Sequence, residues 1–297
     1  MPREARKFLD PQAVRKLANL KLVARFVVEG FIAGLHRSPH RGFSVEFTEY
    51  REYTPGDDLR HLDWRVLARS DKYYVRLYEQ ETNLRAYLLL DVSGSMGYGS
   101  QGLTKLEYGC YLAASLAYLM TRQQDAVSLL AFAEDLVVAL PPKNTPGHLN
   151  VLLKTLGGLQ PQRGTRMSRT LHQLAENIRQ RGLVVLISDL FDEPEEVIRG
   201  LKHFRHRGHE AIVFHLLDPD EQEFPFAGQI AFEDLEDGTT VRTDAAAIRR
   251  AYLAQLRAWQ EHYQREFRRR RIDYVFADTS VPFDRFLAGY LAKRGRM

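Results

Sequence analysis

The segment AYLLLDVSGSMGYGS, residues 86–100, decides the fold class, because a short apolar run ends there in a polar turn rich in glycine. The run from Ala86 to Leu90 has the composition of a buried strand, and the stretch after the turn has apolar residues at helical spacings. A buried strand followed by a helix is the repeating unit of a parallel sheet with crossover helices. The segment therefore predicts the first such unit of an α/β domain.

Five further apolar runs follow at intervals that suit the same architecture. The second and third are joined only by Ala133 to Asp135, which is too short for a crossover, so they predict an antiparallel hairpin at one edge. Helices are predicted after the first strand, on either side of the fourth, and from Ile248 to Phe267. We therefore expect an α/β fold with a doubly wound, mostly parallel six-stranded sheet, its strands at residues 86–90, 126–132, 136–140, 183–188, 211–217 and 272–277.

The first 83 residues have a different pattern. They combine helical material that begins near Asp10 with two extended stretches, residues 43–53 and 73–79, and so predict a small α+β appendage. The first 80 residues contain 15 basic and 11 acidic side chains, which accounts for the whole net charge of +4. We expect the appendage to span residues 1–83 and the α/β domain residues 84–297, with a hairpin insertion near residues 230–243.

Composition excludes several classes of protein. A hydrophobic content of 44% with 27% charged residues in 297 residues is that of an ordinary folded protein, not of a disordered or collagen-like chain. The single cysteine, Cys110, excludes a disulfide framework and a cysteine zinc cage, and it favours the cytoplasm. No apolar run approaches about 18 residues, so we expect no membrane span. The oligomeric state is not fixed by the sequence.

Oxygen-bearing side chains are expected together at the carboxyl edge of the sheet, where doubly wound folds bind ligands. Asp91, Ser93 and Ser95 follow the first strand, Asp189 follows the fourth, and Thr165 lies in a glycine-containing loop before a helix. Oxygen ligands of this kind suit a hard cation, magnesium in the first place, with manganese and calcium as alternatives. The candidate metal ligands are therefore Asp91, Ser93, Ser95, Thr165 and Asp189.

This D-x-S-x-S motif, with a loop threonine and an aspartate after the fourth strand, resembles the metal-ion-dependent adhesion site of von Willebrand factor type A domains. The resemblance covers about residues 84–297. It implies that Ser93, Ser95 and Thr165 contact the metal, that the aspartates bind directly or through water, and that an Asp or Glu of a partner protein completes the shell. Many members have T-D-G where this chain has Ser188 to Leu190, so Asp192 is an alternative ligand to Asp189.

A second resemblance extends into the N-terminal part. Residues 41–69, RGFSVEFTEYREYTPGDDLRHLDWRVLAR, are similar to the bacterial family named domain of unknown function fifty-eight, with its Y-x-P-G-D-D-x-R-x-I-D-W core and leucine here in place of the isoleucine. Because members commonly resemble partners of MoxR-type AAA+ ATPases, the resemblance implies an adaptor for such an ATPase. A structural network of ion pairs and caps is favoured over direct partner contact for this block, and the two roles are compatible. The matching residues are Tyr53, Pro55, Gly56, Asp57, Asp58, Arg60, Asp63 and Trp64.

Other functions fit the sequence less well. The esterase motif G-x-S-x-G fails at Ser93, which also stands where a haloacid-dehalogenase phosphatase needs its second aspartate. Asp91 and Asp189 would repel a phosphate group bound without a cation. The chain has no G-x-x-x-x-G-K-[ST] motif, so any ATP chemistry would belong to a partner. The arginines and aromatic residues of the N-terminal part could bind nucleic acid, but interspersed carboxylates weaken their field. We expect a binding module and no enzyme, with nucleic-acid binding and metal-dependent hydrolysis as alternatives.

Overall fold

The computed structural model describes residues 84–164 and 167–294, together with residues 20, 24, 25, 28, 50–52 and 73–76. The chain divides into two compact units, residues 33–83 and residues 1–32 with 84–297. In the smaller unit, β1 (Tyr50–Glu52) and β2 (Tyr74–Arg76) pair antiparallel, each within one of the two extended stretches predicted there. The predicted block from Tyr53 to Trp64 lies outside the described residues.

The predicted domain boundary between residues 83 and 84 stays a prediction. The N-terminal helical segment, however, packs differently from the prediction. Leu20 and Ala24, which the sequence analysis assigned to the appendage, are buried in the hydrophobic core that contains Leu106 and Cys110 of the α/β domain. Apolar side chains of the N-terminal helical segment therefore contribute to the larger unit.

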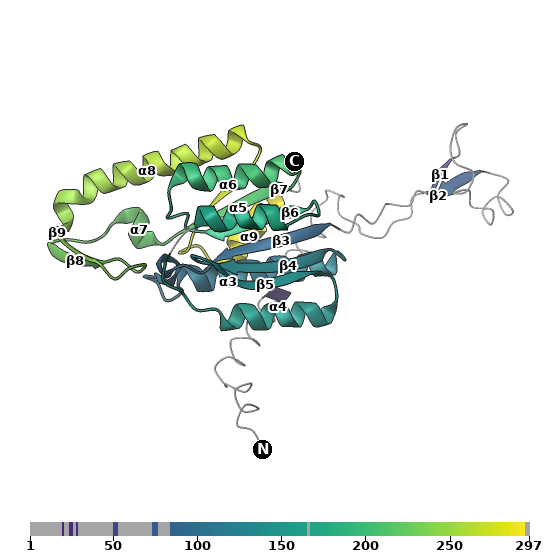
Figure 1. Cartoon of the computed structure of the whole chain (residues 1–297), viewed down its shortest axis with the longest axis horizontal. Helices are drawn as coiled ribbons and strands as arrows, with labels where there is room; N and C mark the ends of the chain where they lie inside the picture. The colour runs from purple at the N-terminus through teal and green to yellow at the C-terminus, as the bar shows by residue number, and fades with distance from the viewer. Residues whose placement is uncertain are drawn as a thin grey trace, which may run out of the picture. The chain divides into compact units, whose positions relative to one another are not determined.

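Six strands form one sheet in the order β10-β7-β6-β3-β4-β5, which confirms the predicted α/β class and mostly parallel sheet (Figure 1). All neighbours pair parallel except the last two, where the three-residue connection turns the chain back on itself and places β5 antiparallel at the edge. The strands are β3 (Arg85–Asp91), β4 (Ala126–Phe132), β5 (Leu136–Lys143), β6 (Leu183–Ser188), β7 (Glu210–Leu217) and β10 (Asp273–Asp278).

Helices cover both faces of this sheet, because the side chains of each central strand alternate between two hydrophobic cores (Figure 1). In β3, Leu88 and Leu90 face one core, and Tyr87 and Leu89 face the other. The first core is closed by α3 (Lys105–Arg122), α4 (Pro146–Gly158) and α9 (Phe283–Arg294), and the second by α5 (Met167–Asn177), α6 (Pro194–His206) and α8 (Ala245–Arg269).

Short elements follow the carboxyl ends of the strands. The 3-10 helix η3 (Gly94–Gly97) comes directly after β3, and α7 (Pro219–Glu223) directly after β7. The hairpin predicted from Asp237-Gly238 is present as β8 (Gln229–Glu233) and β9 (Thr240–Asp244), which pair antiparallel. In the described part of the chain, no helix combines the length and apolar character needed to span a membrane.

Candidate functional site

The candidate site lies where the order of the strands reverses. β3 and β6 are neighbours, but the chain leaves β3 toward β4 on one side and leaves β6 toward β7 on the other. Such a switch point opens a crevice between the carboxyl ends of the two strands. Asp91 ends β3 and Asp189 follows β6, so the topology brings these two predicted residues to the same crevice.

Asp91 is a buried carboxylate held from two sides. Its Oδ1 accepts the backbone N–H of Ser93 at 2.9 Å, and its Oδ2 accepts the hydroxyl of Ser188 at 2.7 Å. Burial and the charge of Asp189 raise the pKa of Asp91 to about 7, although the hydrogen bonds from Ser188 and Ser93 act against the shift. A buried carboxylate next to a second one is stabilised by a cation placed between or beside them.

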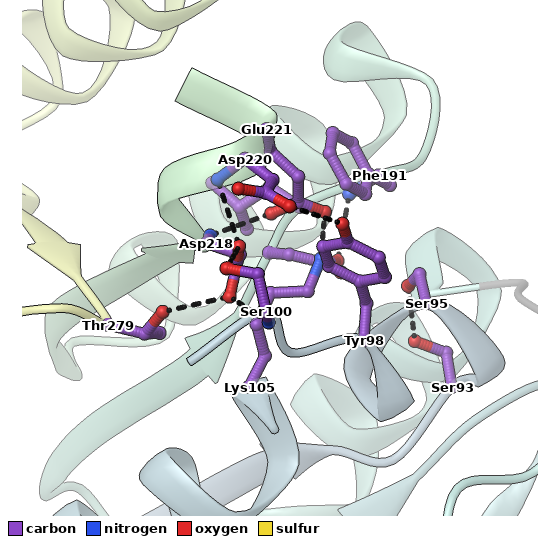
Figure 2. A network of polar contacts seen from close by, with 12 residues as sticks. Ser93, Ser95, Tyr98, Ser100, Lys105, Phe191, Asp218, Asp220, Glu221 and Thr279 are labelled. Carbon is purple, nitrogen blue, oxygen red and sulfur yellow. Dashed lines mark hydrogen bonds and ion pairs between the residues drawn. The ribbon is translucent and has the colours of Figure 1, made fainter. Parts of the chain in front are cut away.

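The two serines of the motif present their hydroxyls together. Ser93 Oγ and Ser95 Oγ lie 3.2 Å apart, as the dashed line between them in Figure 2 shows. Ligands at about 2.1 Å from a magnesium ion on adjacent corners of an octahedron are about 3 Å apart. The separation of the two hydroxyls therefore matches a shared magnesium ion.

Asp189 is engaged by a buried lysine that the sequence analysis did not predict. Its Oδ2 accepts Lys105 Nζ at 2.8 Å, and its Oδ1 accepts the N–H of Phe191 at 3.3 Å. Lys105, the first residue of α3, is completely buried and pairs at 2.5 Å with Glu221 of α7 as well. Burial acts to lower the pKa of Lys105, but Asp189 and Glu221 together raise it above its usual value.

The ammonium group of Lys105 therefore stays charged and takes up one oxygen of Asp189. It also lies 4.7 Å from the centre of the Phe191 ring, a cation–π distance. The second oxygen of Asp189, Oδ1, accepts the Phe191 N–H at 3.3 Å and has a further lone pair for a cation or for a water bound to it. In the described structure, Asp189 thus pairs with a basic side chain, whereas Asp91 accepts hydrogen bonds from the neutral groups of Ser93 and Ser188.

Two candidate ligands remain, Thr165 and the alternative aspartate Asp192. Thr165 lies outside the described residues, but the N–H of Gln162 donates to the carbonyl of Val92 at 2.7 Å, so the segment leading to Thr165 runs beside the motif. Asp192, the alternative to Asp189, accepts the N–H of Ser168 at 3.3 Å and that of Glu193 at 2.7 Å. Both of its oxygens are used by backbone groups.

A network of acidic side chains surrounds Lys105 on the side away from the serine pair (Figure 2). Asp218, directly after β7, accepts the backbone N–H of Ser100 at 2.9 Å and its hydroxyl at 2.5 Å. Tyr98 donates its hydroxyl to Asp220 at 3.2 Å. These contacts fix the loop that follows the D-x-S-x-S motif against α7. Asp218 carries the same signal as Asp91, an acid directly after a buried strand, and could have been found from it.

The residues present fit a magnesium ion, on the chemistry of the donor set. In the part of the chain that the structure describes, no group of three or more Asp, Glu, His or Cys side chains has the geometry of a metal site. A cation here would therefore depend on Asp91 together with the hydroxyls of Ser93 and Ser95. This mixture of one carboxylate and neutral oxygens is the kind that magnesium accepts while keeping water ligands.

Comparison with known proteins now identifies the family. The model of the family described as "Protein of unknown function DUF58" matches residues 49–262. The chain belongs to this family. The match begins one residue before β1 and confirms the family resemblance inferred from the motif between Tyr53 and Trp64. An uncharacterized protein of Mycobacterium tuberculosis is 29% identical to this DUF58 chain over 260 residues, covering 83% of this chain and 81% of the relative.

Solved structures resemble the DUF58 chain in fold. An aerotolerance-related membrane protein from Bacteroides fragilis is 18% identical with a TM-score of 0.50, covering 72% of this chain and 98% of that one. The crystal structure of the SpRpn10 VWA domain is 12% identical with a TM-score of 0.39, covering 71% of this chain and 95% of that one. At 18% identity, the likeness to the Bacteroides fragilis protein concerns the fold alone.

Proposed function

We propose that this DUF58 protein is a metal-dependent protein interaction module, in which magnesium held by Asp91, Ser93 and Ser95 binds a carboxylate of a partner protein. One observation carries the proposal: the buried carboxylate of Asp91 and the hydroxyls of Ser93 and Ser95, which lie 3.2 Å apart, occur together at the switch point of the sheet. When bound, the cation supplies an electrophilic position that prefers a carboxylate oxygen. Thr165 and Asp189 are the further ligands proposed, directly or through water.

The partner proposed is an AAA+ ATPase of the MoxR type, offering an Asp or Glu side chain. Its support is the resemblance noted in the sequence, because members of the family commonly resemble partners of such ATPases. The chain itself has no G-x-x-x-x-G-K-[ST] motif, so ATP chemistry would belong to the partner. A cytoplasmic location is supported by the single cysteine. A binding role is preferred to hydrolysis because Ser93 interrupts both hydrolase motifs.

A pull-down from lysate tests this function, with wild type and Asp91→Asn compared in magnesium and in chelator. We expect an AAA+ ATPase to be retained by wild type in magnesium and lost in the other three conditions, because the cation needs the charge of Asp91. Asp91 is a cleaner target than Asp189, whose removal would leave Lys105 partly unpaired.

Asp135→Asn is the matched control, since Asp135 is an exposed carboxylate in the connection that follows β4 at the same edge of the sheet. It should retain the partner as wild type does. If the same proteins are retained by wild type and Asp91→Asn with and without magnesium, the metal site is not the binding surface. The block from Tyr53 to Trp64 would then be the alternative binding surface.

A further inference from the structure

The turn of the β8-β9 hairpin lies directly against the D-x-S-x-S motif. Gly94 faces the carbonyl oxygen of Leu235 so closely that a Cβ atom on Gly94 would lie 2.3 Å from that oxygen. A side chain at position 94 would collide with this carbonyl group, so the close approach of the two backbone segments requires glycine. The turn is itself ordered by hydrogen bonds, since the N–H of Glu236 donates to Asp234 Oδ1 at 2.7 Å and that of Gly238 to the carbonyl of Asp234 at 2.8 Å.

Glu236 extends from this turn onto the motif. Its Oε1 accepts the backbone N–H of Ser95 at 2.8 Å, across 141 residues of sequence. Gly94 stands between Ser93 and Ser95 in the sequence, and a Cβ atom on Gly94 would lie 3.3 Å from the carboxyl carbon of Glu236. The hairpin thus brings a carboxylate from within the chain to the site where a partner's carboxylate would be expected.

The second oxygen of this carboxylate is unsatisfied. Glu236 Oε2 is buried from solvent and has no hydrogen-bond partner in the described structure. A buried carboxylate oxygen without a partner is costly, and native proteins rarely leave one unpaired. A cation bound to the neighbouring hydroxyls of Ser93 and Ser95 would satisfy it, and the chemistry of a carboxylate oxygen suits magnesium.

We propose that Glu236 is a built-in ligand of the candidate metal site, so that the hairpin occupies the position of the partner's carboxylate until a partner displaces it. This inference rests on the function proposed above. A cavity of about 270 Å³ beside the hairpin, lined by Gly94, Gly97, Pro161, Gln162, Arg163 and Leu235, gives room for an approaching partner residue. Displacement would move only the hairpin turn and leave the sheet and both hydrophobic cores in place.

The test combines magnesium titration calorimetry with hydrogen–deuterium exchange of residues 234–239, on wild type and Glu236→Gln. The glutamine keeps an oxygen for the Ser95 N–H but loses the charge that a cation prefers. We expect the substitution to weaken magnesium binding at least about tenfold. At saturating magnesium, hydrogen exchange in the hairpin turn should be slower than without the metal in wild type. In Glu236→Gln, magnesium should leave the exchange rate of the turn unchanged. Glu233→Gln, an exposed carboxylate on the same hairpin, should behave as wild type.

Three outcomes separate this inference from the function on which it rests. Weaker binding and loss of the magnesium-dependent protection in Glu236→Gln support both. Equal magnesium affinity in the two proteins, with hairpin exchange that does not respond to the metal, overturns the role of Glu236 and leaves the metal site standing. If wild type binds no magnesium, the proposed function fails as well.

Discussion

Replacing Lys105 by methionine is expected to lower the free energy of unfolding by about 3 to 5 kcal/mol. Methionine is close to lysine in length and would fill the same buried space, but it carries no charge. The buried Asp189 and the partly buried Glu221 would then lose their counter-ion, while Asp189 also feels the charge of the buried Asp91. Breaking a buried ion pair on one side is costly because the remaining charge stays desolvated.

Urea denaturation at neutral pH measures this loss. Lys202→Met is the matched control, because Lys202 is exposed on α6 and a surface change of this kind stays within about 0.5 kcal/mol of wild type. The triple variant Lys105→Met, Asp189→Asn, Glu221→Gln should recover much of the lost stability, since it removes the charges that Lys105 neutralises. A loss of less than about 1 kcal/mol for Lys105→Met would show that the ion pairs are not structurally important.

Asp91→Asn is expected to have the opposite effect on the metal-free protein and to stabilise it by about 1 to 3 kcal/mol. The asparagine retains hydrogen-bonding groups toward Ser93 and Ser188 but removes one of two buried like charges. With excess magnesium the order should reverse, because the metal stabilises only a protein that binds it. Residues placed for ligand binding often reduce the stability of the unliganded fold in this way.

Thermal denaturation of both proteins in chelator and in magnesium decides this second prediction. Wild type should gain stability from magnesium and Asp91→Asn should not. The hypothesis of a functional carboxylate is wrong if Asp91→Asn is less stable than wild type in chelator and both gain equally from magnesium. Asp91 would then be a structural residue that binds Ser93 and Ser188.

The sheet could be predicted because its signals are local. Each central strand is a short apolar run, and the three-residue connection between β4 and β5 leaves no alternative to a hairpin. The helices α4 and α9 were not predicted, although α4 has apolar residues at helical spacings. Leu149, Leu152, Leu153 and Leu156 of α4 recur at spacings of three, one and three and are all buried, after a threonine cap and a first-turn proline.

The site could be predicted only in part, because its remaining features depend on contacts between distant segments. Asp91, Ser93 and Ser95 are adjacent in sequence and carry a motif. Lys105 at the start of a helix has the pattern of an ordinary surface lysine, and only the packing of α3 against β6 and α7 makes it buried. Glu236 reaches Ser95 because the hairpin folds back over the motif, which no local pattern specifies.

The central claim is that Asp91, Ser93 and Ser95 hold a divalent cation, and calorimetric titration of the metal-free chain with magnesium tests it most directly. Wild type should bind one magnesium ion per chain, and the double variant Ser93→Ala, Ser95→Ala should lose this binding. Ser100→Ala, whose hydroxyl donates to Asp218 in the same loop, should bind as wild type does. The absence of binding by wild type, or equal binding by the double variant, would contradict the account.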